Sequence, residues 1–293
     1  MIAKHTVDIP ADLSSQQFRR GYGTYEVALD RLRDEAYTDL LRRAIDLGYR
    51  HIDTAQQYQT ESHVAEAIQR SEADPEDMFV ATKLHWSNLG YEDAIETAIE
   101  SKERLGVDTI DLVYVHVPYD TYDPDETLPA LDALVDDGVI DHIGVSNFLP
   151  EMLDVAIERL DHSLFAHQVE MHPLLPQAEL HQLAVTHGHW LVAFSPFLKG
   201  LIGEIREIRT IADRFDSTPH AVSLAWLLDH PNVAVLSHSK NESHMQENLA
   251  GDLPVLADED LELIRGIDRT YRMWDGRIDP WNQANPPGLL DPD

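Results

Sequence analysis

The chain has 293 residues, of which 43% are hydrophobic, so it can form one large α/β domain with a full core or two small ones. Asp and Glu number 53 against 22 Lys and Arg, which gives a formal net charge of -31. This charge argues against nucleic acids and anionic membranes as partners, because both bind basic surfaces. The absence of cysteine excludes disulfides and cysteine-ligated zinc.

The acidic excess is explained most simply by a solvated acidic surface. Molar salt screens charges over about 3 Å, which removes their self-repulsion. We therefore hypothesise a halophilic source and a lower melting temperature in dilute buffer; an unchanged melting curve there would contradict this. Residues Met1–His5 begin no apolar run of signal-peptide length, and no segment reaches the ~20 apolar residues of a membrane span. We expect a soluble, cytoplasmic protein.

A turn-rich N-terminal part, expected to form a short hairpin before Arg20, precedes a regular alternation of strands and helices. The expected strands are Gly21–Tyr25, Ile52–Ala55, Met78–Lys83, Asp111–Val117, Ile143–Ser146, His167–Met171, Leu191–Phe194 and Val233–Leu236. The expected helices are Ala36–Leu47, Glu61–Gln69, Ala94–Leu105, Leu128–Val135, Met152–Leu160, Leu180–Thr186, Ala221–Leu228 and Glu242–Leu249. Eight such units without a break in composition predict parallel pairing and a closed (β/α)8 TIM barrel, forming a single domain over residues 1–293.

Three further features concern the connections. Gly138 lies just beyond a predicted helix, as a C-cap residue does. The segment Pro196–Thr218 is expected to be a long loop with a helical turn. The tail Tyr271–Asp293 is rich in Pro, Trp, Asp and Asn, and we expect an ordered loop over the active-site rim, with a frayed terminus as the alternative.

Four chemically different side chains fall at the carboxyl ends of consecutive predicted strands: Asp53 with Tyr58 on the loop after it, Lys83, and His116. In a barrel, these ends face one pocket. A tyrosine has a pKa of about 10, and a neighbouring ammonium lowers it. A lysine held by an aspartate therefore makes the phenol a better proton donor to a carbonyl oxygen, and a neutral histidine can orient that oxygen.

Each of the four also has a purely structural explanation. Asp53 fits a helix N-cap, Tyr58 a loop residue stacked on a helix, and Lys83 a solvated charge. His116, within an apolar run, fits a satisfied core histidine. The four together, at successive strand ends, favour the functional interpretation.

The stretch Gly48–Tyr58 (GYRHIDTAQQY), with Glu61 after it, resembles the first signature of the aldo-keto reductase family. The segments Ala81–Leu84 and Val115–Pro118 resemble the family's lysine and histidine segments. The resemblance runs from about Gly21 into the tail. It implies a (β/α)8 barrel and NAD(P)H-dependent reduction of an aldehyde or ketone.

The resemblance also implies roles for the four residues. Tyr58 would be the proton donor, Lys83 the partner that lowers its pKa, Asp53 the holder of the lysine, and His116 the residue that orients the carbonyl. The substrate pocket would include Tyr25, Trp86 and His116, with Trp274 and Trp281 from the tail. Aromatic walls favour a small, aromatic or sugar-like carbonyl substrate.

Coenzyme-binding positions follow from the same resemblance. Ser146 and Asn147 correspond to a pair that binds the nicotinamide carboxamide, as does Gln168. Phe194 replaces the usual tyrosine under the nicotinamide ring, which keeps the stacking face and loses the hydroxyl. Ser195 corresponds to a serine near the pyrophosphate, and the other coenzyme positions that the resemblance implies are Thr24, Asp53 and Phe197.

The adenosine end departs from the family pattern. Many members have a lysine and an arginine, which pair with the 2′-phosphate of NADP, where this chain has His238 and His244; neutral imidazoles hold a dianion less well. Lys240 is a candidate substitute. We expect NADP(H) with a weakened preference, and NAD(H) as the alternative. The positions implied at this end are His238, Ser239, His244, Glu247 and Asn248.

Three rival functions were weighed. A Rossmann dehydrogenase is disfavoured because Gly21-Tyr22-Gly23 lacks the third glycine of the dinucleotide fingerprint. A metal-dependent hydrolase would need converging ligands, but His187 and His189 precede a predicted strand, at the wrong end of the barrel. A non-catalytic, cofactor-sensing protein is disfavoured by the intact set of four. We expect a monomer whose partner is a small-molecule carbonyl, with no metal.

Overall fold

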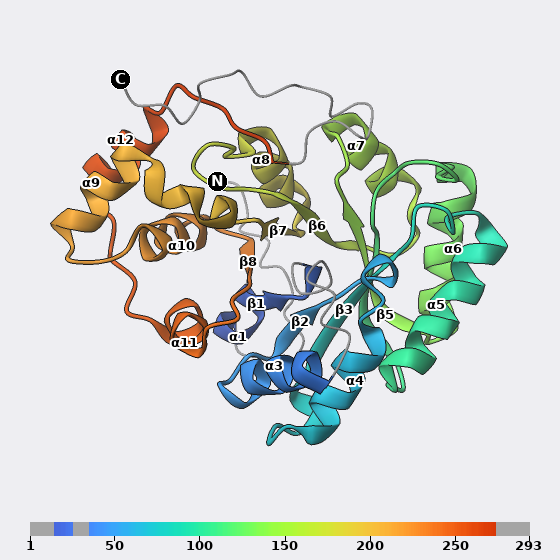
Figure 1. Ribbon diagram of the computed structural model, residues 1–293. Helices are drawn as coiled ribbons and strands as arrows, with labels where there is room; N and C mark the ends of the chain where they lie inside the picture. Colours follow the sequence, from blue (N-terminus) through green and yellow to red (C-terminus); the bar gives the residue numbers. More distant parts are fainter. Residues whose placement is uncertain (1–14, 26–34, 274–293) are drawn as a thin grey trace.

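The computed structural model describes residues 15–25 and 35–273. Within these residues, eight parallel strands close into a barrel in chain order, and β1 pairs with β8 (Figure 1). The predicted (β/α)8 barrel is therefore confirmed, and each predicted strand overlaps an observed one. The strands are β1 (Arg20–Gly23), β2 (His51–Asp53), β3 (Phe79–Leu84), β4 (Ile110–Val115), β5 (Ile140–Ser146), β6 (Leu164–Glu170), β7 (Trp190–Phe194) and β8 (Val233–Ser237).

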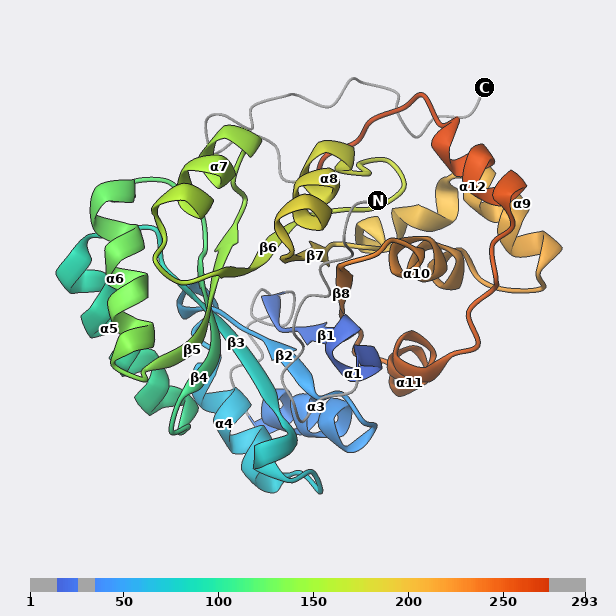
Figure 2. The same ribbon diagram turned by 180° about the vertical axis from the view of Figure 1, so that it is seen from behind.

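Helices surround this barrel, as the two opposite views show (Figures 1 and 2). They are α1 (Ser15–Arg19), α3 (Glu35–Asp46), α4 (Glu61–Arg70), α5 (Tyr91–Leu105), α6 (Pro124–Asp136), α7 (Pro150–Arg159), α8 (Ala178–His187), α9 (Arg206–Arg214), α10 (Pro219–Asp229), α11 (Glu242–Ala250) and α12 (Asp258–Arg265). Among the described residues there are also three 3₁₀ segments: η1 (Gln56–Tyr58), η2 (Pro75–Asp77) and η3 (Leu198–Glu204).

The helix ends follow local sequence signals. Helix α6 begins after Asp123, whose side chain accepts from the Asp125 N–H, and Pro124 occupies its first position. It ends before Gly138, which has a φ of 67° and so confirms the predicted C-cap glycine. Helix α10 starts in the same way, with Thr218 accepting from the Ala221 N–H.

Two expectations for the connecting segments were wrong or incomplete, and one further helix was not expected. The segment Pro196–Thr218 is largely helical, because η3 and α9 occupy most of it, and α12 was not predicted. Residues 15–19, expected in a hairpin, form the helix α1. The earlier part of that hairpin and the tail beyond residue 273 lie outside the described residues.

Helix α1 fills the amino-terminal end of the barrel. Its Phe18 is fully buried, with its ring centroid 5.0 Å from that of Trp190 and 5.2 Å from that of Phe79, both at strand starts. Arg19 donates to the carbonyls of Val233 and Leu228, at 2.8 and 2.6 Å, and so ties α1 to β8 and α10. An aromatic plug at this end leaves chemistry to the carboxyl ends of the strands.

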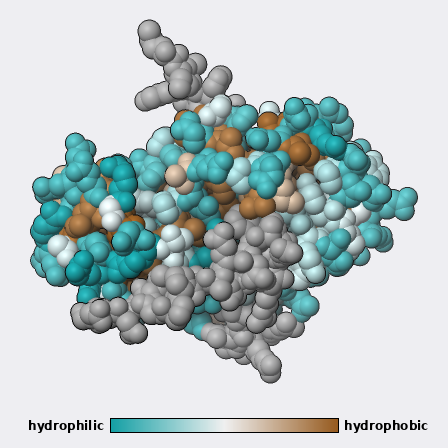
Figure 3. Space-filling model, turned by 90° about the horizontal axis from the view of Figure 1, so that it is seen from above, coloured by the Kyte–Doolittle hydropathy of each residue, from teal (hydrophilic) through white to brown (hydrophobic). Residues whose placement is uncertain are grey.

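The outer surface agrees with the composition. Seen from above, hydrophilic residues cover most of the periphery, and hydrophobic ones lie between them (Figure 3). Across residues 15–25 and 35–273, the structure contains no helix with the length and apolar character that crossing a membrane requires.

Candidate active site

The charged centre of the site is a buried ion pair between Asp53, the last residue of β2, and Lys83 in β3. Both side chains are almost inaccessible, at 4% and 1% exposure, and the lysine Nζ contacts Asp53 Oδ1. Nζ also donates to the Thr54 carbonyl at 2.9 Å, and Gln168 Nε2 donates to Asp53 Oδ2 at 2.7 Å. Burial lowers the pKa of Lys83, and the pair with Asp53 acts in the opposite direction.

This geometry rules out two of the purely structural explanations. Lys83 is not a solvated charge, because it is fully buried. Asp53 is not a helix N-cap, because its two carboxylate oxygens bond Lys83 and Gln168, and the N-cap position of α4 is Thr60.

Tyr58 ends the single turn η1 on the loop after β2. Its Oη lies 3.4 Å from His116 Nε2, and the ammonium of Lys83 lies 5.1 Å from its ring centroid. Burial raises the pKa of Tyr58 well above its usual value, and Asp53 and then Tyr25 raise it further. The expectation of a lowered pKa for Tyr58 is therefore wrong, because desolvation of the phenolate dominates. The phenol is protonated at neutral pH.

His116 follows β4 directly. Burial lowers its pKa well below the usual value, and electrostatic interactions with Lys83 and then His85 lower it further, so the ring is neutral. Its Nδ1 has no hydrogen-bond partner among the described residues, which leaves the Nε2 side facing Tyr58 as its polar contact.

An aromatic wall surrounds the two side chains. The ring centroid of Tyr25 lies 5.1 Å from that of Tyr58, and the ring centroid of Trp86 lies 6.0 Å from that of His116. The sequence missed His85, whose ring lies 3.9 Å from that of Trp86. The expected contributions of Trp274 and Trp281 lie outside the described residues.

The residues expected at the nicotinamide end lie next to this cluster. Asn147, in the left-handed region with a φ of 62°, donates its side-chain amide to the carbonyl of His116 and to the hydroxyl of Ser146, both at 3.0 Å. Its backbone N–H bonds the carbonyl of Gln168. The structure therefore brings Ser146, Asn147 and Gln168 together beside the ion pair, although no sequence pattern indicated the Gln168–Asp53 bond.

Other expected coenzyme positions lie around the same rim. Thr24 is buried, with its N–H bonded to the Asp53 carbonyl at 3.0 Å. Phe194 ends β7, and Ser195 after it has a φ of 54°, in the region that bulky residues avoid. Phe197 packs edge-on against His220, with ring centroids 4.9 Å apart.

The positions expected to bind the adenosine end lie after β8 and on α11. Burial lowers the pKa of His238 to about 4, so this ring is neutral at pH 7. His244 and Glu247 are exposed on α11, whereas Asn248 is buried and Ser239 is half-buried. His220 on α10 was missed; burial lowers its pKa, His244 lowers it further, and Glu247 acts in the opposite direction.

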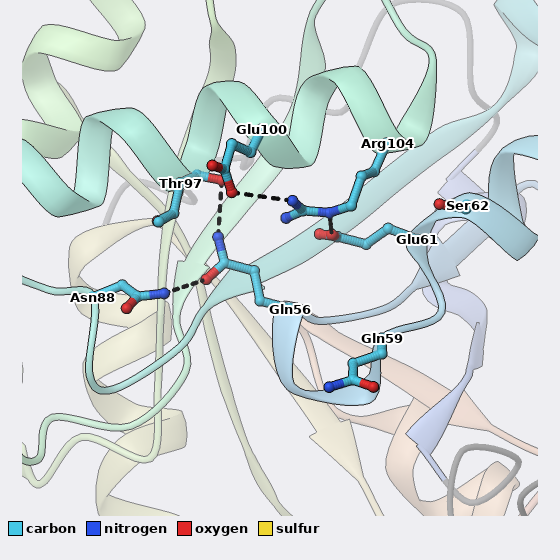
Figure 4. Close-up of a pocket in the computed structure, with 8 residues that line it drawn as sticks. All are labelled: Gln56, Gln59, Glu61, Ser62, Asn88, Thr97, Glu100 and Arg104. Carbon is cyan, nitrogen blue, oxygen red and sulfur yellow. Dashed lines mark hydrogen bonds and ion pairs between the residues drawn. The ribbon is translucent and has the colours of Figure 1, made fainter.

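The loop that carries Tyr58 is bordered by a polar pocket of about 330 Å³ that the sequence did not reveal (Figure 4). Its side chains come from η1, α4, α5 and the loop after β3, and they bond one another across the pocket. The lining residues are Gln56, Gln59, Glu61, Ser62, Asn88, Thr97, Glu100 and Arg104.

The metal-hydrolase alternative gains no support from the geometry. His189 lies just before β7 and His187 ends α8, at the amino-terminal side of the barrel as expected. In the part of the chain that the structure describes, no group of three His, Asp or Glu side chains is placed to hold a metal ion.

The four side chains converge at the carboxyl end of a closed (β/α)8 barrel, and comparison with known proteins identifies the family. Residues 21–269 match the model of the Aldo/keto reductase family. The chain belongs to this family and is therefore an oxidoreductase that acts on carbonyl compounds.

Two curated relatives show how far the likeness extends. An "Aldo-keto reductase" of Mycolicibacterium paratuberculosis is 36% identical over 238 residues, covering 81% of this chain and 83% of the relative. The "Methylglyoxal reductase DkgB" of Yersinia pestis is 30% identical over 267 residues, which cover 89% of this chain and 98% of the relative.

Solved structures agree with both. One protein, provisionally named a 2,5-diketo-D-gluconic acid reductase B, superposes with a TM-score of 0.79 at 31% identity, covering 92% of this chain and 91% of that one. An aldo-keto reductase complexed with NADPH superposes with a TM-score of 0.79 at 26% identity, covering 86% of this chain and 84% of that one.

Proposed function

We propose that this protein reduces a small aldehyde or ketone to the alcohol with NADPH, and that Asp53, Tyr58, Lys83 and His116 are its catalytic residues. The observation that carries the proposal is the contact of a protonated phenol with a neutral imidazole above a buried lysine–aspartate pair. Membership of the family supports the reaction class.

Each residue has a defined task. Tyr58 donates its proton to the carbonyl oxygen as negative charge develops there, and His116 Nε2, 3.4 Å from the phenol oxygen, orients that same oxygen. Lys83 places a positive charge 5.1 Å from the tyrosine ring, which favours the phenolate left after the transfer. Asp53, bonded by Gln168, holds the lysine in place.

The residues present fit the nicotinamide end of the coenzyme better than its phosphate end. NADPH, when bound, supplies the hydride. The amides of Asn147 and Gln168 and the hydroxyl of Ser146 gather donors and acceptors that match a carboxamide. The structure gives His238 as a neutral ring, which matches a 2′-phosphate poorly. NADP(H) is proposed on the strength of the NADPH-bound relative, with NAD(H) as a weaker substrate.

The aromatic side chains around the site and the names of two relatives support a substrate class. Tyr25 and Trp86 beside Tyr58 and His116 leave an aromatic entrance suited to short carbonyl compounds. Two relatives are named as reductases of methylglyoxal and of a diketo-sugar acid. We propose short 2-oxoaldehydes and keto-sugars as substrates, and a cytoplasmic, monomeric enzyme whose whole chain forms one domain.

A panel of methylglyoxal, glyceraldehyde, aromatic aldehydes and keto-sugars, followed by NADPH absorbance at high salt, tests this function. Turnover is expected with NADPH and, more weakly, with NADH. The competing view, a non-catalytic sensor on the same barrel, predicts coenzyme binding without turnover of any member of the panel.

A further inference from the structure

One side chain of the polar pocket connects the elements that carry the proposed catalytic residues. Gln56 Nε2 donates to the Thr97 carbonyl at 3.0 Å and to Ser101 Oγ at 3.1 Å. Its Oε1 accepts from the His85 N–H at 2.9 Å and from Asn88 Nδ2 at 3.3 Å. An amide has two donors and an oxygen with two lone pairs, so these bonds use its whole capacity.

The position of Gln56 in the chain gives these bonds their importance. It lies three residues after Asp53 and two before Tyr58, whereas His85 lies two residues after Lys83. The side chain therefore fastens the loop of the proton donor to the end of β3 and fastens both to α5. Figure 4 shows its bonds to the Thr97 carbonyl and to Asn88.

A second set of hydrogen bonds connects α4, β3 and α5. Glu61 accepts from Thr82 Oγ1 at 2.6 Å and from Arg104 Nε at 2.7 Å. Arg104 also donates to Ser101 Oγ at 3.0 Å, and this hydroxyl is shared with Gln56. Because these polar groups satisfy one another's hydrogen-bonding capacity, we interpret the pocket as a structural connection between α5 and the site and not as a ligand-binding site.

The backbone of the turn that carries Tyr58 has few hydrogen bonds within the turn itself. The turn η1 is three residues long, with backbone bonds from the Tyr58 N–H to the Ala55 carbonyl and from the Gln59 N–H to the Gln56 carbonyl. A single 3₁₀ turn has no cooperative stability of its own, so its orientation depends on anchoring side chains.

We propose that Gln56 is a positioning residue for carbonyl reduction, which holds the Tyr58 hydroxyl at its place against His116. The inference rests on the proposed role of Tyr58 as proton donor. It concerns the rate of the chemical step and not coenzyme binding, because the side chain faces α5 on the side of the loop away from the site.

The test compares Gln56→Leu with Gln57→Leu, the same change at the exposed neighbour in the same turn. Misplacing a catalytic group by about 1 Å costs up to roughly 100-fold in rate. We expect Gln56→Leu to lower the single-turnover reduction rate about 10- to 100-fold, with the NADPH dissociation constant within about twofold of the wild type. Gln57→Leu is expected to change neither.

A readout without turnover separates this inference from the proposed function. In ¹⁵N-histidine NMR, the Nε2 resonance of His116, assigned by its loss in His116→Gln, is expected to move in Gln56→Leu and not in Gln57→Leu. If Gln56→Leu moves the His116 resonance but the wild-type protein reduces no carbonyl compound, the positioning role of Gln56 stands and the proposed function fails. If Gln56→Leu does not fold, Ser101→Ala, which removes one shared acceptor, is expected to move the same resonance. Rates and resonances equal to those of the Gln57→Leu protein would overturn the inference.

Discussion

The corner of the barrel at β2, β3 and β4 differs from the end at β8 and α11 in how its polar groups are satisfied. At the first, Asp53 and Lys83 are buried and bonded by groups of the chain itself. At the second, His244 and Glu247 are exposed on the surface of α11. The proposed catalytic geometry is therefore set by folding alone, whereas the proposed binding of the adenosine end would depend in part on exposed side chains that a ligand must still order.

Removal of the Tyr58 phenol is expected to have the largest effect on the reaction. Tyr58→Phe keeps the ring and its burial and removes the proton donor, so reduction is expected to slow by about 10²- to 10⁴-fold. The NADPH dissociation constant is expected to stay near that of the wild type, because the adenosine end is untouched. Single-turnover absorbance and a fluorescence titration measure the two quantities. An active phenylalanine variant would assign the proton to another group.

The buried pair predicts a large loss of stability. Asp53→Asn leaves the ammonium of Lys83 buried without its counter-charge, which typically costs about 3–5 kcal/mol. Asp125→Asn is the matched control, since its ion pair with Arg159 lies on the surface. An exposed pair of this kind contributes about 0–1 kcal/mol. Equal unfolding free energies for the two variants in denaturant titrations would contradict the larger contribution to stability that is assigned to the buried pair.

The coenzyme end offers a test with a smaller effect. His238→Lys places a cation where the neutral ring now stands, and a hydrogen bond to a charged group contributes about 1.5–3 kcal/mol. The NADPH dissociation constant is expected to fall by roughly tenfold, with NADH as the internal control because it has no 2′-phosphate. An equal gain in affinity for NADH would show that the side chain at position 238 does not bind the 2′-phosphate.

The pKa shifts predict that pH has almost no effect on the chemical step. The pKa of Tyr58 is raised, so the phenol keeps its proton through neutral pH and above; the pKa of His116 is lowered, so the ring is already neutral under weakly acidic conditions. Neither group changes protonation between about pH 6.5 and 9, starting from ordinary values near 10 and 6.5. Single-turnover rates should therefore vary less than about twofold over this range. A titration limb that vanishes in His116→Gln would contradict the assignment.

Much of the fold was readable from the sequence because the barrel repeats one strand–helix unit. The polar residues at successive strand ends, such as Asp53, Lys83 and His116, marked where each strand stops. The helix α9 was missed because charged residues dominate its sequence, although Ile208, Ile211 and Ala212 recur at helical spacing and are buried.

Other features depend on contacts that a sequence does not record. The predicted direction of the Tyr58 pKa was wrong because burial, which is a property of the fold, outweighs a neighbouring charge. The four bonds of Gln56 join segments up to 45 residues apart, and no local pattern distinguishes it from Gln57. The positions of Ser146, Asn147 and Gln168 were predicted from resemblance, but their bonds to His116 and Asp53 were not.

Proton transfer from Tyr58 depends most on where a carbonyl oxygen lies relative to the phenol. A crystal structure of the protein with NADP⁺ and an unreactive carbonyl or carboxylate analogue measures this directly. If Tyr58 donates the proton, the analogue's oxygen is expected within hydrogen-bond distance, about 2.6–3.2 Å, of both Tyr58 Oη and His116 Nε2, beside the nicotinamide ring. An analogue bound elsewhere on the barrel, or an oxygen contacting neither side chain, would contradict it.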